Sequence, residues 1–256
     1  MTESVPGDLV QTERIDHVLV IRMCRENKRN SFDRALADAL DAALNTLDDD
    51  IDLWVGVLTG TPKVFSAGSD LTSRGDYDTE RGGEYGLIRR RRRKPLIAAI
   101  EGFALGGGLE LAMACDMVVA ASDARLGLPE VRRGLVPTSA GLFRAPSSLP
   151  VNVARELILT GEPMSARRGY EVGFVNVVTE PGGALDAAVG LAQKVCLNGP
   201  VAVQACVAEI NDALNADDQT GWEATARAKA AISASDDIHE GLAAFFEKRE
   251  PRWTGR

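Results

Sequence analysis

The sequence predicts an α/β fold in which mostly parallel strands alternate with helices before the chain becomes purely helical. Short apolar runs rich in β-branched residues predict buried strands at residues 18–23, 54–59, 96–100, 117–120 and 174–178. Between the first two runs, apolar residues recur at spacings of four and three over residues 31–47, which predicts an amphipathic helix capped by Asn30 or Ser31. Parallel pairing follows from the alternation, because parallel strands need long, usually helical crossovers.

After Thr179 the strand pattern stops, and four helices are expected at residues 184–197, 201–214, 221–233 and 237–249. Gly182 and Gly183 mark the change. We therefore predict a core over residues 1–183 that carries the functional site. A helical C-terminal region over residues 184–256 is expected to pack on this core or on a neighbouring subunit.

Composition excludes several classes of function. A hydrophobic fraction of 45% over 256 residues is enough to fill a core, so disorder is not expected. The 29 basic and 37 acidic residues give a net charge of -8, which argues against nucleic acid and anionic membranes as partners. No apolar stretch approaches the roughly 20 residues of a membrane-spanning helix, and residues 1–11 lack the pattern of a secretory signal. A cytoplasmic location is expected.

Few residues suit metal or histidine chemistry. The four cysteines are scattered without close pairing, which suggests neither a disulfide framework nor a thiolate metal site. The two histidines, His17 and His239, are too few for a histidine triad or a histidine-rich metal site. We therefore expect no metal and a mechanism based on carboxylates.

A basic run at residues 89–94 is the strongest local charge anomaly. Two interpretations remain open. The favoured one is a solvated helix end, whose cations suit the negative C-terminal dipole. The other is a docking site for substrate phosphates.

Three segments carry chemistry. In the first, residues 64–71, a buried strand gives way to Ala67, Gly68 and Ser69, small residues that leave backbone amides accessible. An ordinary turn, with Gly68 at positive φ and Asp70 capping a helix, is the favoured explanation when this segment is taken alone. The segment is therefore a weak signal by itself.

The second segment, residues 101–110, follows a strand and opens a helix with three consecutive glycines. The first amides of a helix are unpaired, and Gly107 could present its N–H to an oxyanion without obstruction. Neither the G-x-G-x-x-G spacing nor the Gly-Lys-Ser/Thr ending is present, which argues against a nucleotide-phosphate enzyme. Glu110 in the first turn either complements the dipole or carries chemistry.

The third segment, residues 124–130, places Glu130 behind Pro129 in apolar surroundings after a strand. Such a carboxylate either caps the next helix or transfers a proton. Spacing alone leaves both glutamates open to a structural role.

Taken in order, these segments resemble the enoyl-CoA hydratase/isomerase family, or crotonases, across nearly the whole chain. The match begins at residues 24–32, similar to N-R-P-x-x-x-N-A-L, and continues through residues 65–71, 102–116 and 127–136. It closes with residues 240–249. The resemblance implies a crotonase spiral of ββα turns, followed by C-terminal helices that build a homotrimer or a dimer of trimers.

The resemblance also implies roles for particular residues. Backbone amides of Ser69 and Gly107 would bind the thioester oxygen, and Glu110 and Glu130 would be the catalytic pair. An acyl-CoA thioester is the expected substrate, so coenzyme A enters with it and no separate cofactor is expected. Coenzyme A would lie against Lys28, Arg29, Ala67, Gly68, Ser69, Asp70 and Leu71, with Lys248 near its phosphates.

The implied activity is hydration of a 2-enoyl-CoA, a hydro-lyase reaction. An enoyl-CoA isomerase needs a single carboxylate, so the presence of Glu130 favours hydration. A non-catalytic acyl-CoA binding protein is the other alternative, and the stretch Pro137-Thr138-Ser139, where hydratases often carry Pro-Gly-x-Gly, is its one sequence hint. The segment 72–86 corresponds to a variable wall of the acyl pocket and is expected to be flexible.

Overall fold

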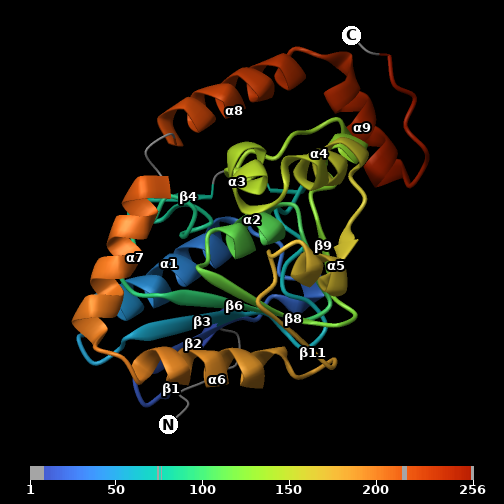
Figure 1. The fold of residues 1–256 in the computed structure, drawn as a ribbon. Coiled ribbons are helices and arrows are strands. Elements are labelled where there is room, and N and C mark those ends of the chain that lie inside the picture. The colour runs from blue at the N-terminus through green and yellow to red at the C-terminus, as the bar shows by residue number, and fades with distance from the viewer. Residues whose placement is uncertain (1–8, 74, 76, 215–217, 255–256) are drawn as a thin grey trace.

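A six-stranded sheet forms the centre of the molecule in the computed structural model, which describes residues 9–73, 75, 77–214 and 218–254. Its strand order is β1-β2-β3-β6-β8-β11, and all neighbours pair in parallel except β1 with β2 (Figure 1). The strands are β1 (Val10–Ile15), β2 (Val18–Met23), β3 (Val55–Thr59), β6 (Leu96–Ile100), β8 (Met117–Ala121) and β11 (Val177–Thr179). The expected parallel α/β architecture is confirmed.

Two smaller sheets complete the β-structure of the described residues. One has the order β10-β9-β7, from β7 (Phe103–Leu105), β9 (Arg125–Gly127) and β10 (Met164–Ser165). The other is the hairpin of β4 (Asp78–Thr79) and β5 (Gly83–Glu84). The parallel pairing of β7 with β9 matters for function, because it brings the segments after both strands to one edge.

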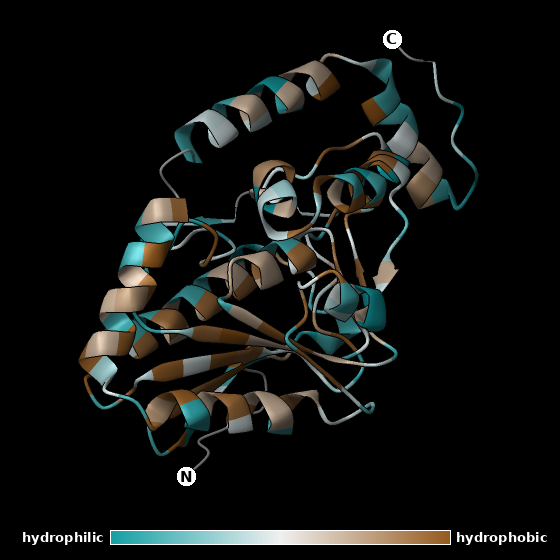
Figure 2. Cartoon of the chain, in the orientation of Figure 1, coloured by the Kyte–Doolittle hydropathy of each residue, from teal (hydrophilic) through white to brown (hydrophobic). Residues whose placement is uncertain are grey.

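Helices cover both faces of the central sheet. On one face lies α1 (Arg34–Asp49), and on the other lies α6 (Ala184–Cys196), which packs on β3, β6 and β8 (Figure 1). The strands between them are largely hydrophobic (Figure 2). Small side chains of α6, namely Ala184, Ala188 and Ala192, let it approach the sheet closely.

The remaining helices before β11 are shorter. They are η1 (Glu26–Lys28), α2 (Gly107–Met113), η2 (Glu130–Arg133), α3 (Gly141–Ser148), α4 (Val151–Thr160) and α5 (Ala166–Glu171). The chain ends in α7 (Pro200–Leu214), α8 (Asp218–Ser233) and α9 (Asp236–Glu247), which arch around the core in Figure 1. The four helices expected after Thr179 are thus confirmed, whereas a division of the chain at residue 184 stays a prediction. None of the described helices has the length and apolarity needed to cross a bilayer.

Several element boundaries predicted from sequence were wrong, among them the starts of α1 and of the last strand, and that of α8, which begins at Asp218 and not at residue 221. Helix α1 begins three residues late, with Asp33 as its cap, because the Asp33 carboxylate accepts from the Leu36 amide at 2.9 Å. Asn30 instead donates to the carbonyls of Val64 and Phe65. The last strand begins at Val177, since the amides of Phe174 and Val175 bond the Gly169 carbonyl in a turn. Residues 1–8, within the segment that lacks a signal pattern, lie outside the described residues.

The basic run at residues 89–94 is not helical, so its interpretation as a solvated helix end was wrong, whereas phosphate docking at its exposed arginines stays a prediction. Alternate side chains point inward: Arg90, Arg92 and Lys94 are buried, whereas Arg89, Arg91 and Arg93 are exposed. These three buried side chains bind groups on, or at the ends of, helices that are remote in sequence. They hold protein groups, not solvent or substrate phosphates.

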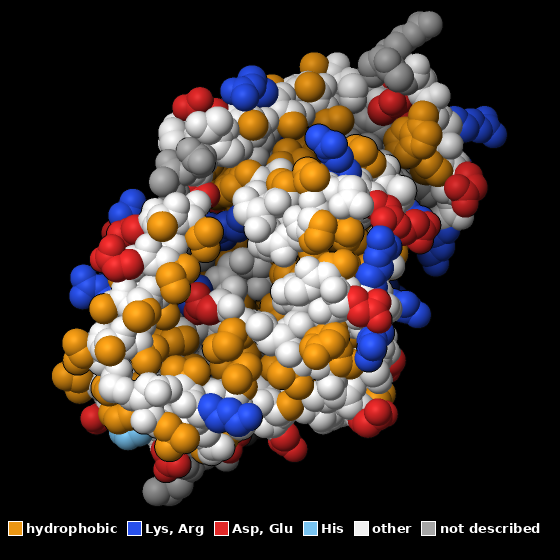
Figure 3. All heavy atoms as spheres, viewed as in Figure 1, with side chains coloured by type: hydrophobic (Ala, Val, Ile, Leu, Met, Phe, Trp, Pro, Cys, Tyr) orange, Lys and Arg blue, Asp and Glu red, His pale blue; other side chains and the backbone are white. Residues whose placement is uncertain are grey.

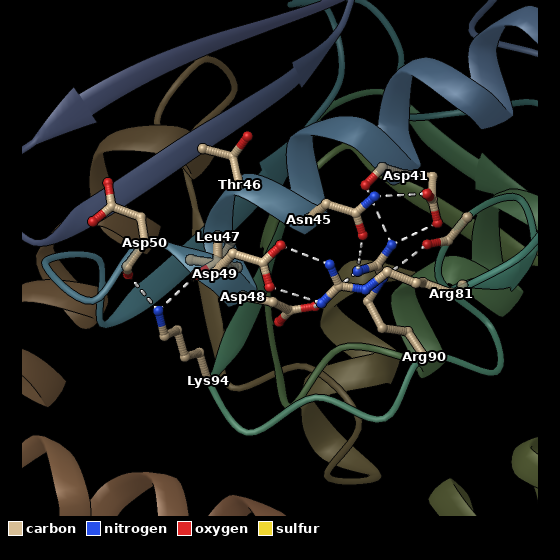
Figure 4. Close-up of polar contacts among 12 residues, drawn as sticks. Asp41, Asn45, Thr46, Leu47, Asp48, Asp49, Asp50, Arg81, Arg90 and Lys94 are labelled. Carbon is tan, nitrogen blue, oxygen red and sulfur yellow. Dashed lines mark hydrogen bonds and ion pairs between the residues drawn. The ribbon is translucent and has the colours of Figure 1, made fainter.

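Arg90 makes the densest of these contacts (Figure 4). Its guanidinium pairs with Asp41 at 2.6 Å and Asp48 at 2.7 Å, both on α1, and donates to Asn45 and to the Gly86 carbonyl. Contact with two carboxylates at once suits the planar, multiply donating arginine head. Arg90 thereby fixes the segment before β6 to the second half of α1.

Lys94 and Arg92 bind the carboxyl ends of two helices. The Lys94 ammonium donates to the carbonyls of Leu47 and Asp50 at the end of α1 (Figure 4). Arg92 donates to the Ala114 carbonyl at the end of α2 and pairs with Asp116 at 2.7 Å. Cations there satisfy the last carbonyls and suit the negative end of the helix dipole. The sequence correctly predicted that these cations suit a helix C-terminus. The helices involved are α1 and α2, however, and not a helix formed by the basic run itself.

Candidate active site

Two glycine-containing loops press against each other at the edge shared by β7 and β9. A bridge pairs Ser66 with Ala104, and Gly68 has a φ of 84°. A Cβ atom at Gly68 would lie 2.6 Å from the Gly107 amide nitrogen, so only glycine permits this approach. The contact places the backbone of the first sequence segment beside the start of α2.

The amides of Ser69 and Gly107 have no hydrogen-bond acceptor within the described part of the chain. The neighbouring amides are satisfied: Gly68 donates to the Ser66 hydroxyl and Asp70 donates to the Phe32 carbonyl. Since buried backbone N–H groups are nearly always paired, two open donors side by side are unusual. Such a pair suits an acceptor oxygen that arrives with a ligand.

Asp70 serves the loop itself. Burial raises the pKa of its carboxyl, but hydrogen bonds from Thr72 and the Arg25 guanidinium at 2.9 Å outweigh this, so the pKa lies below its ordinary value. Asp70 thus closes a turn onto Thr72 and caps none of the described helices. Its side chain is engaged by protein groups.

The residues predicted to bind coenzyme A are brought together only in part. Lys28 and Arg29 lie exposed at η1, and the Arg29 carbonyl accepts from the Ala67 amide at 3.0 Å, which joins this turn to the loop of Gly68, Ser69, Asp70 and Leu71. Lys248 lies exposed at the end of α9, a helix that packs on η2. In the described structure its side chain makes no hydrogen bond or ion pair with the rest of the set.

Glu110 is buried and anchored through one carboxylate oxygen. Its Oε1 accepts from the amides of Ser139 and Gly141, each at 2.8 Å. A Cβ atom at Gly141 would lie 2.8 Å from this oxygen, so glycine is needed at the contact. Burial, and next the charge of Glu130, raise the pKa of Glu110 well above its ordinary value, although the two amides act in the opposite direction.

Glu130 opens η2 and faces the same site from the loop after β9. Its Oε1 would lie 3.1 Å from a Cβ atom at Gly106, so this carboxylate adjoins the start of α2. Its Oε2 is buried and finds no partner among the described residues. Burial raises the pKa of Glu130 too, with Arg133 acting in the opposite direction. Two carboxyl groups with raised pKa values thus lie near the start of α2.

Tyr85 belongs to this site and was missed from sequence. It lies in the segment expected to be flexible, yet it is 2% exposed and its hydroxyl contacts the Ser69 hydroxyl at 2.7 Å. A Cβ atom at Gly107 would lie 2.5 Å from the same hydroxyl oxygen. Its neighbours Gly82, Gly83 and Gly86 offered the only signal, since they mark a tight hairpin. Arg74 and Asp76 of that segment lie outside the described residues.

The described residues include no group of three or more histidine, cysteine or acidic side chains that could hold a metal ion. A single possible metal ligand such as Cys115 is engaged by the protein, because its thiol donates to the Leu111 carbonyl. The chemistry available at the site is therefore that of two carboxylates, two open amides and a phenol.

We expect Glu110→Gln to stabilise the fold above neutral pH. An unfolded glutamate ionises near 4.3, and the folded group has a raised pKa, so the native state keeps a proton that the unfolded state has lost and stability falls as pH rises through this window. Glutamine does not ionise, and its Oε1 can still accept from Ser139 and Gly141. A pKa difference of one between the folded and unfolded states corresponds to about 1.4 kcal/mol, so a gain above about 1 kcal/mol is expected at alkaline pH. Urea unfolding between about pH 4 and pH 9 measures it, and a difference independent of pH would contradict the argument.

The chain matches the family described as enoyl-CoA hydratase/isomerase over residues 13–256. It is 34% identical to 2,3-dehydroadipyl-CoA hydratase of Escherichia coli (strain K12), covering 95% of this chain and 97% of that one. It is 32% identical to the short-chain-enoyl-CoA hydratase of Clostridium acetobutylicum, covering 93% and 94%.

Solved structures agree. A carnitinyl-CoA dehydratase from Mycobacterium avium 104 superposes with a TM-score of 0.91 at 41% identity, covering 98% of this chain and all of that one. The expected crotonase fold and the expectation of an enzyme of the enoyl-CoA hydratase kind are confirmed. On these likenesses the chain belongs to the enoyl-CoA hydratase/isomerase family.

Proposed function

We propose that the protein is an enoyl-CoA hydratase that adds water across the C2–C3 double bond of a 2-enoyl-CoA thioester. The observation that carries this proposal is the placement of the buried Glu110 and the partly buried Glu130, both with raised pKa values, beside two open backbone amides. The two amides suit an enolate oxygen, and the two glutamates suit a water molecule. Hydration needs both.

The amides of Ser69 and Gly107 accept the thioester carbonyl oxygen in this mechanism. Their hydrogen bonds draw electron density from C3 and stabilise the enolate that forms when water attacks. Donors fixed in advance cost no reorganisation during the reaction, and loss of one typically costs roughly 3 kcal/mol in barrier. The close packing of Gly68 on Gly107 supplies this fixed geometry.

Glu110 and Glu130 transfer the protons. Burial raises the pKa of both carboxyls and the charge of Glu130 raises that of Glu110 further, which favours the state in which one is protonated and the other ionised. The ionised carboxylate removes a proton from water during attack at C3, and the protonated one supplies a proton to C2. One carboxylate gains a proton and the other loses one, so the total charge of the pair is unchanged. No co-reactant besides water is needed. We assign the roles to the pair, not to either residue.

Coenzyme A would bind along the turn of Lys28 and Arg29 and the loop from Ala67 to Leu71. The hydrogen bond between Arg29 and Ala67 makes these a continuous surface beside the open amides. Lys248 would approach the phosphates from α9. The relatives named above act, by their names, on different acyl groups, so the acyl chain is the property that the assay must define.

The test of this function is absorbance at the enoyl-thioester band with purified protein and crotonyl-CoA, followed by longer and aromatic 2-enoyl-CoAs. Hydration removes the conjugated band. An isomerase would instead create that band from a 3-enoyl-CoA, and a binding protein would hold 2-enoyl-CoA tightly without changing it. Absence of turnover on the whole series would overturn the proposal.

A homotrimer or a dimer of trimers is the proposed assembly. Orange side chains gather over α7 and its junction with α6 in Figure 3, and Leu197, Val201, Ile210 and Leu214 are 58–87% exposed. Exposed apolar surface of this kind commonly marks an interface. We expect light scattering to give a trimer or hexamer mass, and the double substitution Ile210→Asp with Leu214→Asp to lower it. A monomeric wild-type protein would contradict the expectation.

A further inference from the structure

Tyr85 holds an unusual backbone conformation at the centre of the site. Its φ is 57°, in the left-handed region that bulky residues rarely adopt. The ring is buried between Phe32, with ring centroids 4.9 Å apart, and Tyr77, at 5.5 Å. Such strained residues cluster at functional sites, because the surrounding structure must hold them in place.

The surroundings hold Tyr85 firmly. Its amide donates to the Tyr77 carbonyl at 3.1 Å. The next residue, Gly86, packs so closely on α1 that a Cβ atom there would lie 2.8 Å from the Ala37 carbonyl oxygen, and its own carbonyl accepts from the Arg90 guanidinium. The buried Arg90 network in Figure 4 therefore also fixes the segment that carries the tyrosine.

The Tyr85 hydroxyl lies beside both open amides. It contacts the Ser69 side chain at 2.7 Å, and the residue it contacts is the one whose amide is open. It also lies against Gly107, where a Cβ atom would be 2.5 Å away. A hydroxyl that accepts from the Ser69 hydroxyl keeps its own O–H free to donate.

Electrostatics keep this hydroxyl protonated. Burial, followed by the charge of Glu110, raises the pKa of Tyr85 above its ordinary value, while the hydroxyls of Ser139 and Ser69 act in the opposite direction. A phenol with a raised pKa is a neutral donor at all pH values at which the enzyme would work. No phenolate competes with the ligand oxygen.

We propose that Tyr85 is a catalytic residue that donates a third hydrogen bond, beside those of the Ser69 and Gly107 amides, to the thioester carbonyl oxygen. The Ser69 hydroxyl acts as a positioning group that orients the phenol. This inference rests on the proposed function for the identity of the thioester. It adds a side chain to a donor set that the resemblance assigns to backbone alone.

The test uses 4-(dimethylamino)cinnamoyl-CoA, whose absorption moves to longer wavelength when the carbonyl is polarised. The wild-type protein should shift the band on binding, and Tyr85→Phe should shift it markedly less, because the ring stays and one donor is lost. With a turned-over 2-enoyl-CoA, kcat should fall by up to about a hundredfold, near the lower end for loss of one oxyanion donor, with little change in KM. Ser69→Ala should give a smaller loss of the same sign.

Tyr77→Phe is the matched control. Its hydroxyl donates to the Asp70 carbonyl at 3.1 Å and its ring packs on Tyr85, so this variant removes a neighbouring phenol that a backbone carbonyl engages. We expect the wild-type band shift in this variant. Melting temperatures of all variants show whether each is folded.

Three results would overturn the inference: an unchanged band shift in Tyr85→Phe, tighter binding of the probe by that variant, or no band shift in the wild-type protein. Tighter binding would mean that the phenol occupies the place of the carbonyl oxygen and must leave it. The probe reports binding without turnover, so this outcome is separable from the proposed reaction. A wild-type protein that polarises the probe but hydrates no 2-enoyl-CoA would refute the reaction and retain Tyr85 as a donor.

Discussion

Glu110→Gln and Glu130→Gln are each expected to lower kcat for hydration by about 10²- to 10⁴-fold, the range that a positioned proton donor or acceptor contributes. Glutamine keeps the shape of the side chain and can neither give nor take the proton. At Glu110 its Oε1 can still accept from Ser139 and Gly141, so the loss reports chemistry and not collapse of the site. Steady-state kinetics on the best 2-enoyl-CoA of the series measure the effect.

Glu13→Gln is the matched control, because Glu13 is exposed on the edge strand β1 and makes no contact with the site. Its kcat should equal that of the wild-type protein. Full activity in Glu130→Gln would remove this residue from the mechanism and leave a single-carboxylate reaction such as isomerisation.

The pH profile separates the pair from a single carboxylate. In the wild-type protein kcat/KM should fall at low pH, where both glutamates are protonated, and at high pH, where both are ionised. Burial raises both pKa values, so the acid limb should lie above the ordinary carboxyl range. The residual activity of either variant should lose one limb, since an amide does not titrate. A profile without an acid limb above that range would contradict the shared proton.

Arg90→Met is expected to destabilise the fold by about 3–5 kcal/mol, the typical cost of removing one partner of a buried ion pair. The side chain of Arg90 is 1% exposed and those of Asp41 and Asp48 are 15% and 14% exposed, so the two carboxylates would be left close together without their shared cation. The Gly86 carbonyl would lose its donor as well. Denaturant unfolding at one fixed protein concentration measures the change.

Arg91→Met provides a control within the same basic run. Arg91 is exposed between two buried cations, and its replacement should change the free energy of unfolding by no more than about 0.5 kcal/mol. Equal effects of the two substitutions would show that the buried pairs contribute nothing beyond the general charge of the run. Hydration by folded Arg90→Met should also drop, because this arginine fixes the segment that carries Tyr85.

Local patterns in the sequence determined the main elements. Apolar runs located β2, β3, β6 and β8, and periodicity located α1, since burial of one face leaves a periodic trace. The edge strand β1 was missed because its residues are largely exposed and carry no such trace. Three glycines and the following carboxylate marked the start of α2 without any knowledge of its neighbours.

The tertiary structure alone decided how these elements work together. Pairing of β7 with β9 brings Glu130 to Glu110, and the raised pKa values follow from burial by segments far apart in the chain. The composition of the basic run predicts a solvated segment, yet alternate side chains enter the core. Their partners there are Asp41 and Asp48 on α1 and Asp116 in the turn before β8. Tyr85 faces the open amides only through a left-handed turn held by α1. Sequence thus specified which groups are present, whereas desolvation and pairing, which depend on long-range contacts, decided their chemistry.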